Sequence, residues 1–254
     1  MTAEPQPPDR NPKGDSESHL ALRWPLRIML TMLIAYLVYN LFYPTFTWGQ
    51  KTTVTVSTPD GLRSGSSVVE VSWWATPSIL PDAPDTLYDI TGEAVVVDLG
   101  NGRYLFALLN RAESVGLEVF GGAEHPTLSR PRGNLLDMAR RVVASTGEAR
   151  DLPRQSFPLL VTFDEINDPA SVRRVDPGNL TATFGTGYQL NGVVLSITDE
   201  SVTKGVVESV LGWLTEVGNE RFYLHQNTPR LLKDFTPEQR IQPSHFLSID
   251  HWAK

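Results

Sequence analysis

Residues 91–111 read TGEAVVVDLGNGRYLFALLNR, and two apolar runs flank Gly100-Asn101-Gly102. Asn and Gly tolerate positive φ, so this pattern predicts a β-hairpin. Both runs are almost continuously apolar, which is typical of strands that are covered on both faces. The sequence therefore places this hairpin at the centre of the core.

The segment before the hairpin predicts a second strand pair. Residues 51–57, KTTVTVS, and 67–74, SVVEVSWW, alternate between apolar and other residues with the period of a strand. The residues between them, TPDGLRSGS (58–66), suit a turn and predict a long connection. Adjacent strand residues point to opposite faces, so at least one of Trp73 and Trp74 is expected in the core.

The segment after the hairpin predicts one clear helix. Residues 133–145, GNLLDMARRVVAS, place apolar side chains at helical spacing. A helix within 199–218 is weaker, because Gly205 and Gly212 each cost about 1 kcal/mol relative to alanine. The remaining predicted elements are strands in 157–169, around 181–184, over 193–198 and within 243–254.

This order of elements defines the fold class. Strands outnumber helices and seldom alternate with them, which favours an α+β domain over residues 51–254. We expect a mostly antiparallel sheet or sandwich with one or two packed helices. The loop-like ends of 121–158 suggest that two lobes divide there.

An apolar segment precedes this domain. Residues 28–50 contain no charge, and a bilayer core needs about 20 helical residues. We expect a transmembrane anchor helix over 24–48, which Pro44 ends or kinks near its far side. The expected membrane-interface residues are Trp24, Arg27, Tyr43 and Trp48.

The residues on either side of the apolar segment indicate that the segment is not cleaved and in which direction it crosses the membrane. The residues after it are bulky and aromatic, unlike the small residues of a signal-peptidase site. Four basic residues lie before the helix, whereas only Lys51 and Arg63 follow closely, which favours a cytoplasmic N-terminus. Residues 1–22 are rich in Pro and charge and predict a disordered cytoplasmic tail.

Three residues of the apolar segment are candidates for association with another helix. Thr31 and Ala35 form a small-xxx-small pair, and the amide of Asn40 could bond across helices. The alternative is that water or the helix's own backbone satisfies the amide.

Charge and cysteine content limit the partners and the compartment. Four acids balance the four basic residues before the helix, so the formal charge of −7 belongs to residues 51–254. This sign argues against nucleic acid as a partner. The chain has no Cys, which a bacterial envelope tolerates more readily than a eukaryotic secretory pathway. The sequon at Asn179 keeps the eukaryotic alternative open.

No catalytic, cofactor or metal motif stands out. The five His are scattered, and Asp168 belongs to an acidic turn that lacks the spacing of a calcium loop. No G-x-S-x-G or phosphate-binding loop is present. We expect no enzyme, cofactor or metal site. Four acids beside predicted strands leave glycoside hydrolysis as an alternative: Glu93, Asp98, Asp164 and Glu165.

These observations favour a single-pass protein of the bacterial inner membrane with its N-terminus in the cytoplasm and its C-terminal domain in the periplasm. The expected function is a binding or accessory subunit of an envelope complex, whose partners are the lipid bilayer and an integral-membrane or periplasmic protein. The alternative is a membrane-tethered hydrolase that acts on cell-wall glycan or peptide.

Overall fold

The computed structural model describes residues 15–76, 86–122, 132–217, 224 and 238–248. The chain divides into two units, residues 1–44 and 45–254. The first contains the helix α1 (Asp15–Phe42). The second contains, in chain order, β1 (Thr45–Thr58), β2 (Gly61–Ala75), β3 (Thr86–Thr91), β4 (Val95–Gly100), β5 (Arg103–Ala107), α2 (Ala112–Val119), α3 (Arg132–Ala144), β6 (Ala149–Asp151), β7 (Leu160–Phe163), β8 (Val172–Arg174), α4 (Thr181–Phe184), β9 (Gln189–Thr198), α5 (Val206–Val210) and α6 (Trp213–Val217).

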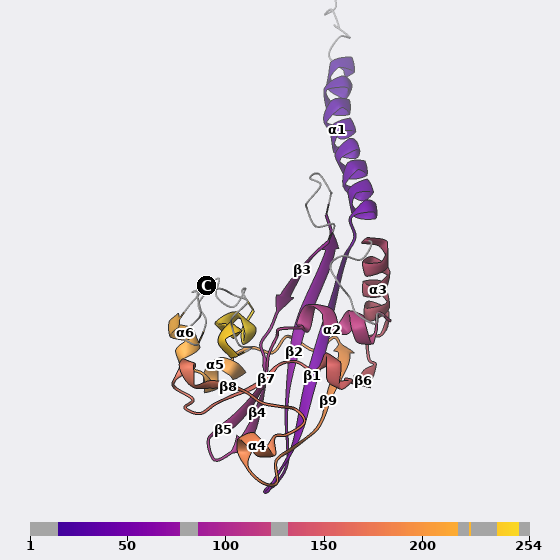
Figure 1. The fold of residues 1–254 in the computed structure, drawn as a ribbon. Helices are drawn as coiled ribbons and strands as arrows, with labels where there is room; N and C mark the ends of the chain where they lie inside the picture. Colours follow the sequence, from indigo (N-terminus) through magenta and orange to yellow (C-terminus); the bar gives the residue numbers. More distant parts are fainter. Residues whose placement is uncertain (1–14, 77–85, 123–131, 218–223, 225–237, 249–254) are drawn as a thin grey trace, which may run out of the picture. The chain divides into compact units, whose positions relative to one another are not determined.

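The second unit is built from two antiparallel sheets. One has the order β3-β2-β1-β9-β6, and the other has the order β4-β5-β7-β8. β1 and β2 are the long strands of the first sheet, and α2 and α3 lie against β1, β2 and β3 (Figure 1). The mostly antiparallel two-sheet class is therefore confirmed.

The hairpin predicted from residues 91–111 is confirmed. β4 and β5 pair up to Gly100 and Arg103, and Asn101 and Gly102 between them have φ of 56° and 71°. Those values suit the tight turn that matches strand twist. The hairpin separates two apolar clusters: Val97 faces the first, and Phe106 on β5 faces the second. It is therefore covered on both faces, as expected.

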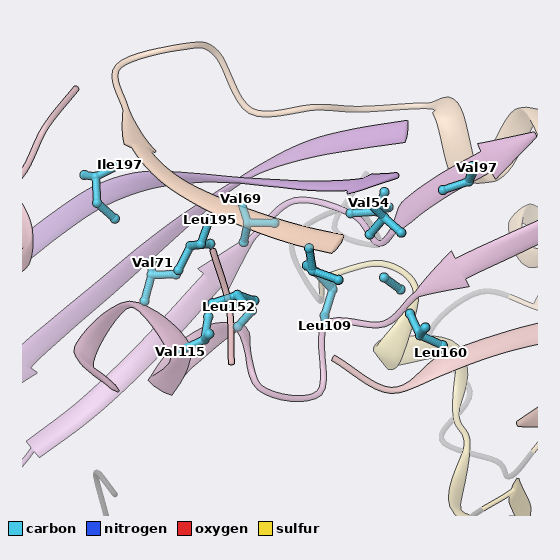
Figure 2. Packing of buried hydrophobic residues seen from close by; sticks show 14 of the residues in the cluster. Val54, Val69, Val71, Val97, Leu109, Val115, Leu152, Leu160, Leu195 and Ile197 are labelled. Carbon is cyan, nitrogen blue, oxygen red and sulfur yellow. The ribbon is translucent and has the colours of Figure 1, made fainter. Parts of the chain in front are cut away.

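The first cluster lies between the two sheets. Val54 from β1, Val69 from β2, Val97 from β4 and Leu195 from β9 point into it (Figure 2). Gly65 on β2 lies where the two sheets approach closely, since a Cβ there would lie 1.9 Å from the carbonyl oxygen of Val96. The sandwich therefore depends on the absence of a side chain at this position.

Several predicted boundaries need correction. β1 and β2 are joined at Pro59 and Asp60, with Thr58 paired to Gly61, so the long connection over 58–66 is wrong. The strand positions that flank this turn are largely exposed, and an exposed face needs no apolar alternation. Residues 121–158 do not divide two lobes, because β6 pairs with β9 inside the first sheet.

The second half also differs from the prediction in two places. Residues 181–184 form the short helix α4 rather than a strand, because Asn179 Oδ1 accepts a bond from Ala182 N and starts a helical turn. The helix expected within 199–218 is two short helices. Gly205 has a left-handed φ of 84° before α5, and Gly212 lies between α5 and α6.

The end of the described chain is irregular rather than a strand. Pro243–His245 forms a 3-10 turn, and Leu247 makes an isolated antiparallel bridge to Glu93. The rest of the predicted strand, residues 249–254, lies outside the described residues.

The helix α1 has different limits from the expected span of 24–48. It ends at Phe42, since Pro44 cannot continue a helix, and β1 begins at Thr45. It begins at Asp15, so it includes residues 15–22 of the predicted tail, where SESHLAL contains several good helix formers. Residues 1–14 lie outside the described residues.

Candidate functional site

A cleft of about 460 Å³ lies beside β3, the start of α2 and the 3-10 turn at Pro243–His245. It combines apolar side chains with acids, a histidine and hydroxyl groups. Such a mixture in a concave surface is typical of a ligand site. The lining residues are Tyr88, Asp89, Ile90, Leu109, Asn110, Glu113, Ser244, His245 and Ser248.

Hydrogen bonds hold α2, the segment before it and the 3-10 turn in place around this cleft. The Trp73 indole N–H donates to the carbonyl of Glu113 over 2.9 Å and ties α2 to the first sheet. Leu109 N donates to the carbonyl of His245 over 2.9 Å and ties the end of the described chain to the segment before α2. Asn110 Oδ1 accepts from Leu159 N over 3.0 Å. The cleft is therefore a built feature of the fold.

Glu113 is the acid whose environment stands out. Burial raises the pKa of its carboxyl, and the negative charge of Glu118 adds to that effect, whereas a backbone hydrogen bond and Arg111 oppose it. The pKa of the neighbouring Tyr88 hydroxyl is also raised, by burial and then by the charge of Glu113. Glu113 therefore holds its proton to a higher pH than an exposed glutamate does.

His245 is displaced in the opposite sense. Burial lowers the pKa of its imidazole, because a desolvated site disfavours the cation. Its Nδ1 accepts from Gln242 N over 3.4 Å, which orients the ring within the 3-10 turn. The cleft thus holds an acid whose pKa is raised by burial and a histidine whose pKa is lowered by burial.

The four acids considered for hydrolysis do not line this cleft, and the side chains of three of them have structural partners. Glu93 is fully buried, and its carboxylate accepts from Val206 N and Val207 N over 3.0 and 3.1 Å. Asp98 Oδ1 accepts from Gly100 N in the hairpin turn. Asp164 pairs with Arg173, and Glu165 is exposed beside it.

The helix candidates lie on an exposed helix that is long and apolar enough to cross a membrane, by length and composition, over Trp24–Phe42. Thr31 Oγ1 donates to the carbonyl of Arg27 over 2.9 Å, and Asn40 Nδ2 donates to the carbonyl of Tyr36 over 2.8 Å. The backbone of the same helix therefore satisfies both side chains. Ala35 is exposed on the same helix.

The expected interface residues divide between the two units. Trp24 is 65% exposed on α1, and Arg27 is exposed on the same helix. Tyr43 follows the end of α1 and is half-buried. Trp48 needs correction: it is buried in the first cluster, because its position on β1 faces the core, and its indole N–H donates to Gln50 Oε1. Trp73 is likewise buried, as expected for at least one of the two adjacent tryptophans.

The sequence reasoning missed Tyr88, Asn110 and Glu113. It placed no helix at Ala112–Val119, because the strand run YLFALL was followed only as far as Arg111. The available signal was the change from a buried apolar strand to Asn110, Arg111 and Glu113, since functional side chains often follow strand ends. His245 was noted only as one of five scattered histidines.

Within the described ranges, no group of three or more His, Asp or Glu could hold a metal ion. Comparison of the chain with family models, curated proteins and solved structures found no match.

The raised pKa of Glu113 predicts a pH-dependent effect on stability. Below the ordinary glutamate pKa of 4.5, the carboxyl is protonated in both the folded and the unfolded state, so it does not lower the free energy of unfolding. As the pH rises through the folded pKa, ionisation in a desolvated site lowers the free energy of unfolding. Glu113→Gln should therefore gain stability relative to the parent between pH 4 and pH 7.

Urea unfolding at several pH values measures this difference. Glu165→Gln, at an exposed acid, is the matched control and should follow the parent. If the free energies of unfolding of Glu113→Gln and the parent differ by the same amount at every pH, the carboxyl of Glu113 is not in the desolvated environment assigned to it.

Proposed function

We propose that this chain is a membrane-anchored binding subunit of a bacterial envelope complex, with its N-terminus in the cytoplasm and residues 45–254 in the periplasm. The observation that carries the binding role is the cleft, which combines Tyr88 and Ile90 with the acids Asp89 and Glu113. Mixed apolar and polar walls are what a specific binding site requires.

The anchor is supported by α1 and by the basic residues that precede the charge-free segment 28–50. α1 is compatible with a single-pass membrane or signal anchor. β1 begins at Thr45, directly after Pro44, so any anchor held by α1 also tethers the β domain. A tethered binding domain meets its partner at a raised local concentration, which strengthens weak contacts.

Isolation of the full-length protein from native membranes in mild detergent tests this proposal. We expect a stoichiometric partner to be retained by the parent and lost with Ser244→Trp, since Ser244 is exposed and lines the cleft. Ser201→Trp is the matched control, at an exposed residue outside the cleft lining. A solitary monomer, or equal retention by both variants, would contradict the proposal.

A second function is favoured by the paired shifts of Glu113 and His245. An acid with a raised pKa and a neutral histidine in one cleft suit general acid-base chemistry, as in a hydrolase of cell-wall glycan or peptide. If so, the full-length parent should release soluble fragments from purified cell walls. Glu113→Gln should then lower the rate by about 100-fold or more. Equal release by parent and variant would exclude Glu113 as the acid.

A further inference from the structure

β3 is an edge strand of the first sheet within the described part of the chain, where its paired neighbour is β2. The N–H of Ile90 donates over 2.9 Å to Asp89 Oδ1, a side-chain acceptor outside β2. Since alternate residues of a strand direct their N–H and C=O groups to the same side, Tyr88 and Ile90 direct theirs to the outer edge. A charged side chain next to such an edge is a common means of protecting it.

The same outer edge already carries a paired segment just beyond β3. Ala94 N donates to the carbonyl of Phe246 over 2.8 Å, and Ser248 N donates to the carbonyl of Gly92 over 2.9 Å. Glu93 and Leu247 form an antiparallel bridge between these bonds. Gly92 and Ala94 lie two and four residues beyond Ile90 in the chain. This paired segment therefore ends two residues from Ile90, which lines the cleft.

The charge of the cleft indicates what kind of segment could pair with the outer edge of β3. Its lining contains the acids Asp89 and Glu113 and no described Lys or Arg. The neighbouring Arg111 pairs with Glu118 and donates to the carbonyl of Gln155. Tyr88 is 42% exposed and presents an aromatic ring, which attracts cations. A segment with basic side chains complements this surface.

We propose that the outer edge of β3, together with the cleft, accepts an extended basic segment of a partner protein as an added antiparallel strand. This inference rests on the proposed binding function and specifies its partner. The backbone of the added strand pairs with Tyr88 and Ile90 and replaces the contact between Ile90 N and Asp89. A basic side chain then reaches Glu113, and its charge favours loss of the Glu113 proton.

Binding of defined peptides to the full-length chain in zwitterionic detergent tests the proposal. The probe is an acetylated and amidated hexapeptide of alternating lysine and valine, labelled with a fluorophore and followed by anisotropy. We expect it to bind, and N-methylation of the backbone amides on its pairing side should weaken it by about tenfold or more, since each lost bond costs about 1 kcal/mol. Glu113→Gln should weaken it by about fivefold, and Glu165→Gln should not.

Five outcomes would overturn the proposal. If a glutamate-valine hexapeptide of the same pattern binds equally well, the acids of the cleft do not select a basic segment. If N-methylation does not weaken binding of the lysine-valine peptide, the peptide does not pair with β3 as a strand. If the peptide binds only to a variant truncated after Ser248, then residues 249–254 of this chain, and not a partner, occupy the edge. If the protein self-associates and the lysine-valine peptide disrupts that association, then a second copy of this chain occupies the edge. If the peptide fails to bind while Ser244→Trp still loses its partner, the binding function stands and only the added strand is wrong.

Discussion

Replacing Phe106 with alanine is expected to lower the free energy of unfolding by about 3–5 kcal/mol. Phe106 is fully buried on β5, and its ring lies 5.6 Å from that of Phe163 and 5.7 Å from that of Phe246, both close to perpendicular. Alanine removes the ring at the centre of this aromatic group and leaves a cavity. Because the sheet is packed on both faces, it cannot shift to close that cavity.

Urea unfolding of the full-length protein in mild detergent, followed by tryptophan fluorescence, measures the effect. Leu62→Ala, at a residue that is 69% exposed, is the control and should change stability by less than about 0.5 kcal/mol. Phe106→Leu should lie between the parent and Phe106→Ala, which keeps the test informative if the alanine variant does not fold. Equal stability of parent and alanine variant would contradict the two-sided core.

The second large effect is expected at Glu93. Its side chain satisfies two backbone N–H groups at the start of α5 while fully buried. Glu93→Ala leaves both donors without this acceptor, at about 1–3 kcal/mol for each unsatisfied group. We expect a total loss of about 2–6 kcal/mol in the same unfolding assay.

Two further substitutions define the role of Glu93. Glu93→Gln retains one acceptor oxygen and should lose less than Glu93→Ala. Glu70→Ala, at an exposed acid on β2, should be close to neutral. If the buried alanine variant and the exposed control were equally stable, Glu93 would not be the support of α5.

Glu93 also illustrates the limit of the sequence reasoning. Beside a predicted strand, it resembled a catalytic acid, since nothing local indicates that α5, more than 100 residues later, brings its N–H groups to it. The hairpin around Asn101 was predictable because its turn residues and apolar runs are adjacent in the chain. Contacts distant in sequence, such as Glu93 with Val206, depend on the completed fold.

The same distinction separates the anchor from the cleft. The limits of the charge-free segment are local, and Pro44 alone explains why α1 stops at Phe42. The cleft brings together Tyr88, Glu113 and His245, which come from three separate parts of the chain. Its acid was hidden because desolvation of Glu113 arises from packing, which leaves no sequence pattern.

Photo-crosslinking in the native cells tests the central claim most directly, namely that the edge of β3 and its cleft bind a partner protein. A photoreactive amino acid replaces Tyr88 in the full-length chain and, as the matched control, the exposed Leu62 at the far end of β2. We expect one dominant adduct from position 88, lost when Ser244→Trp is added, and none from position 62. No adduct from position 88, or the same adducts from both positions, would show that this edge does not bind a partner protein.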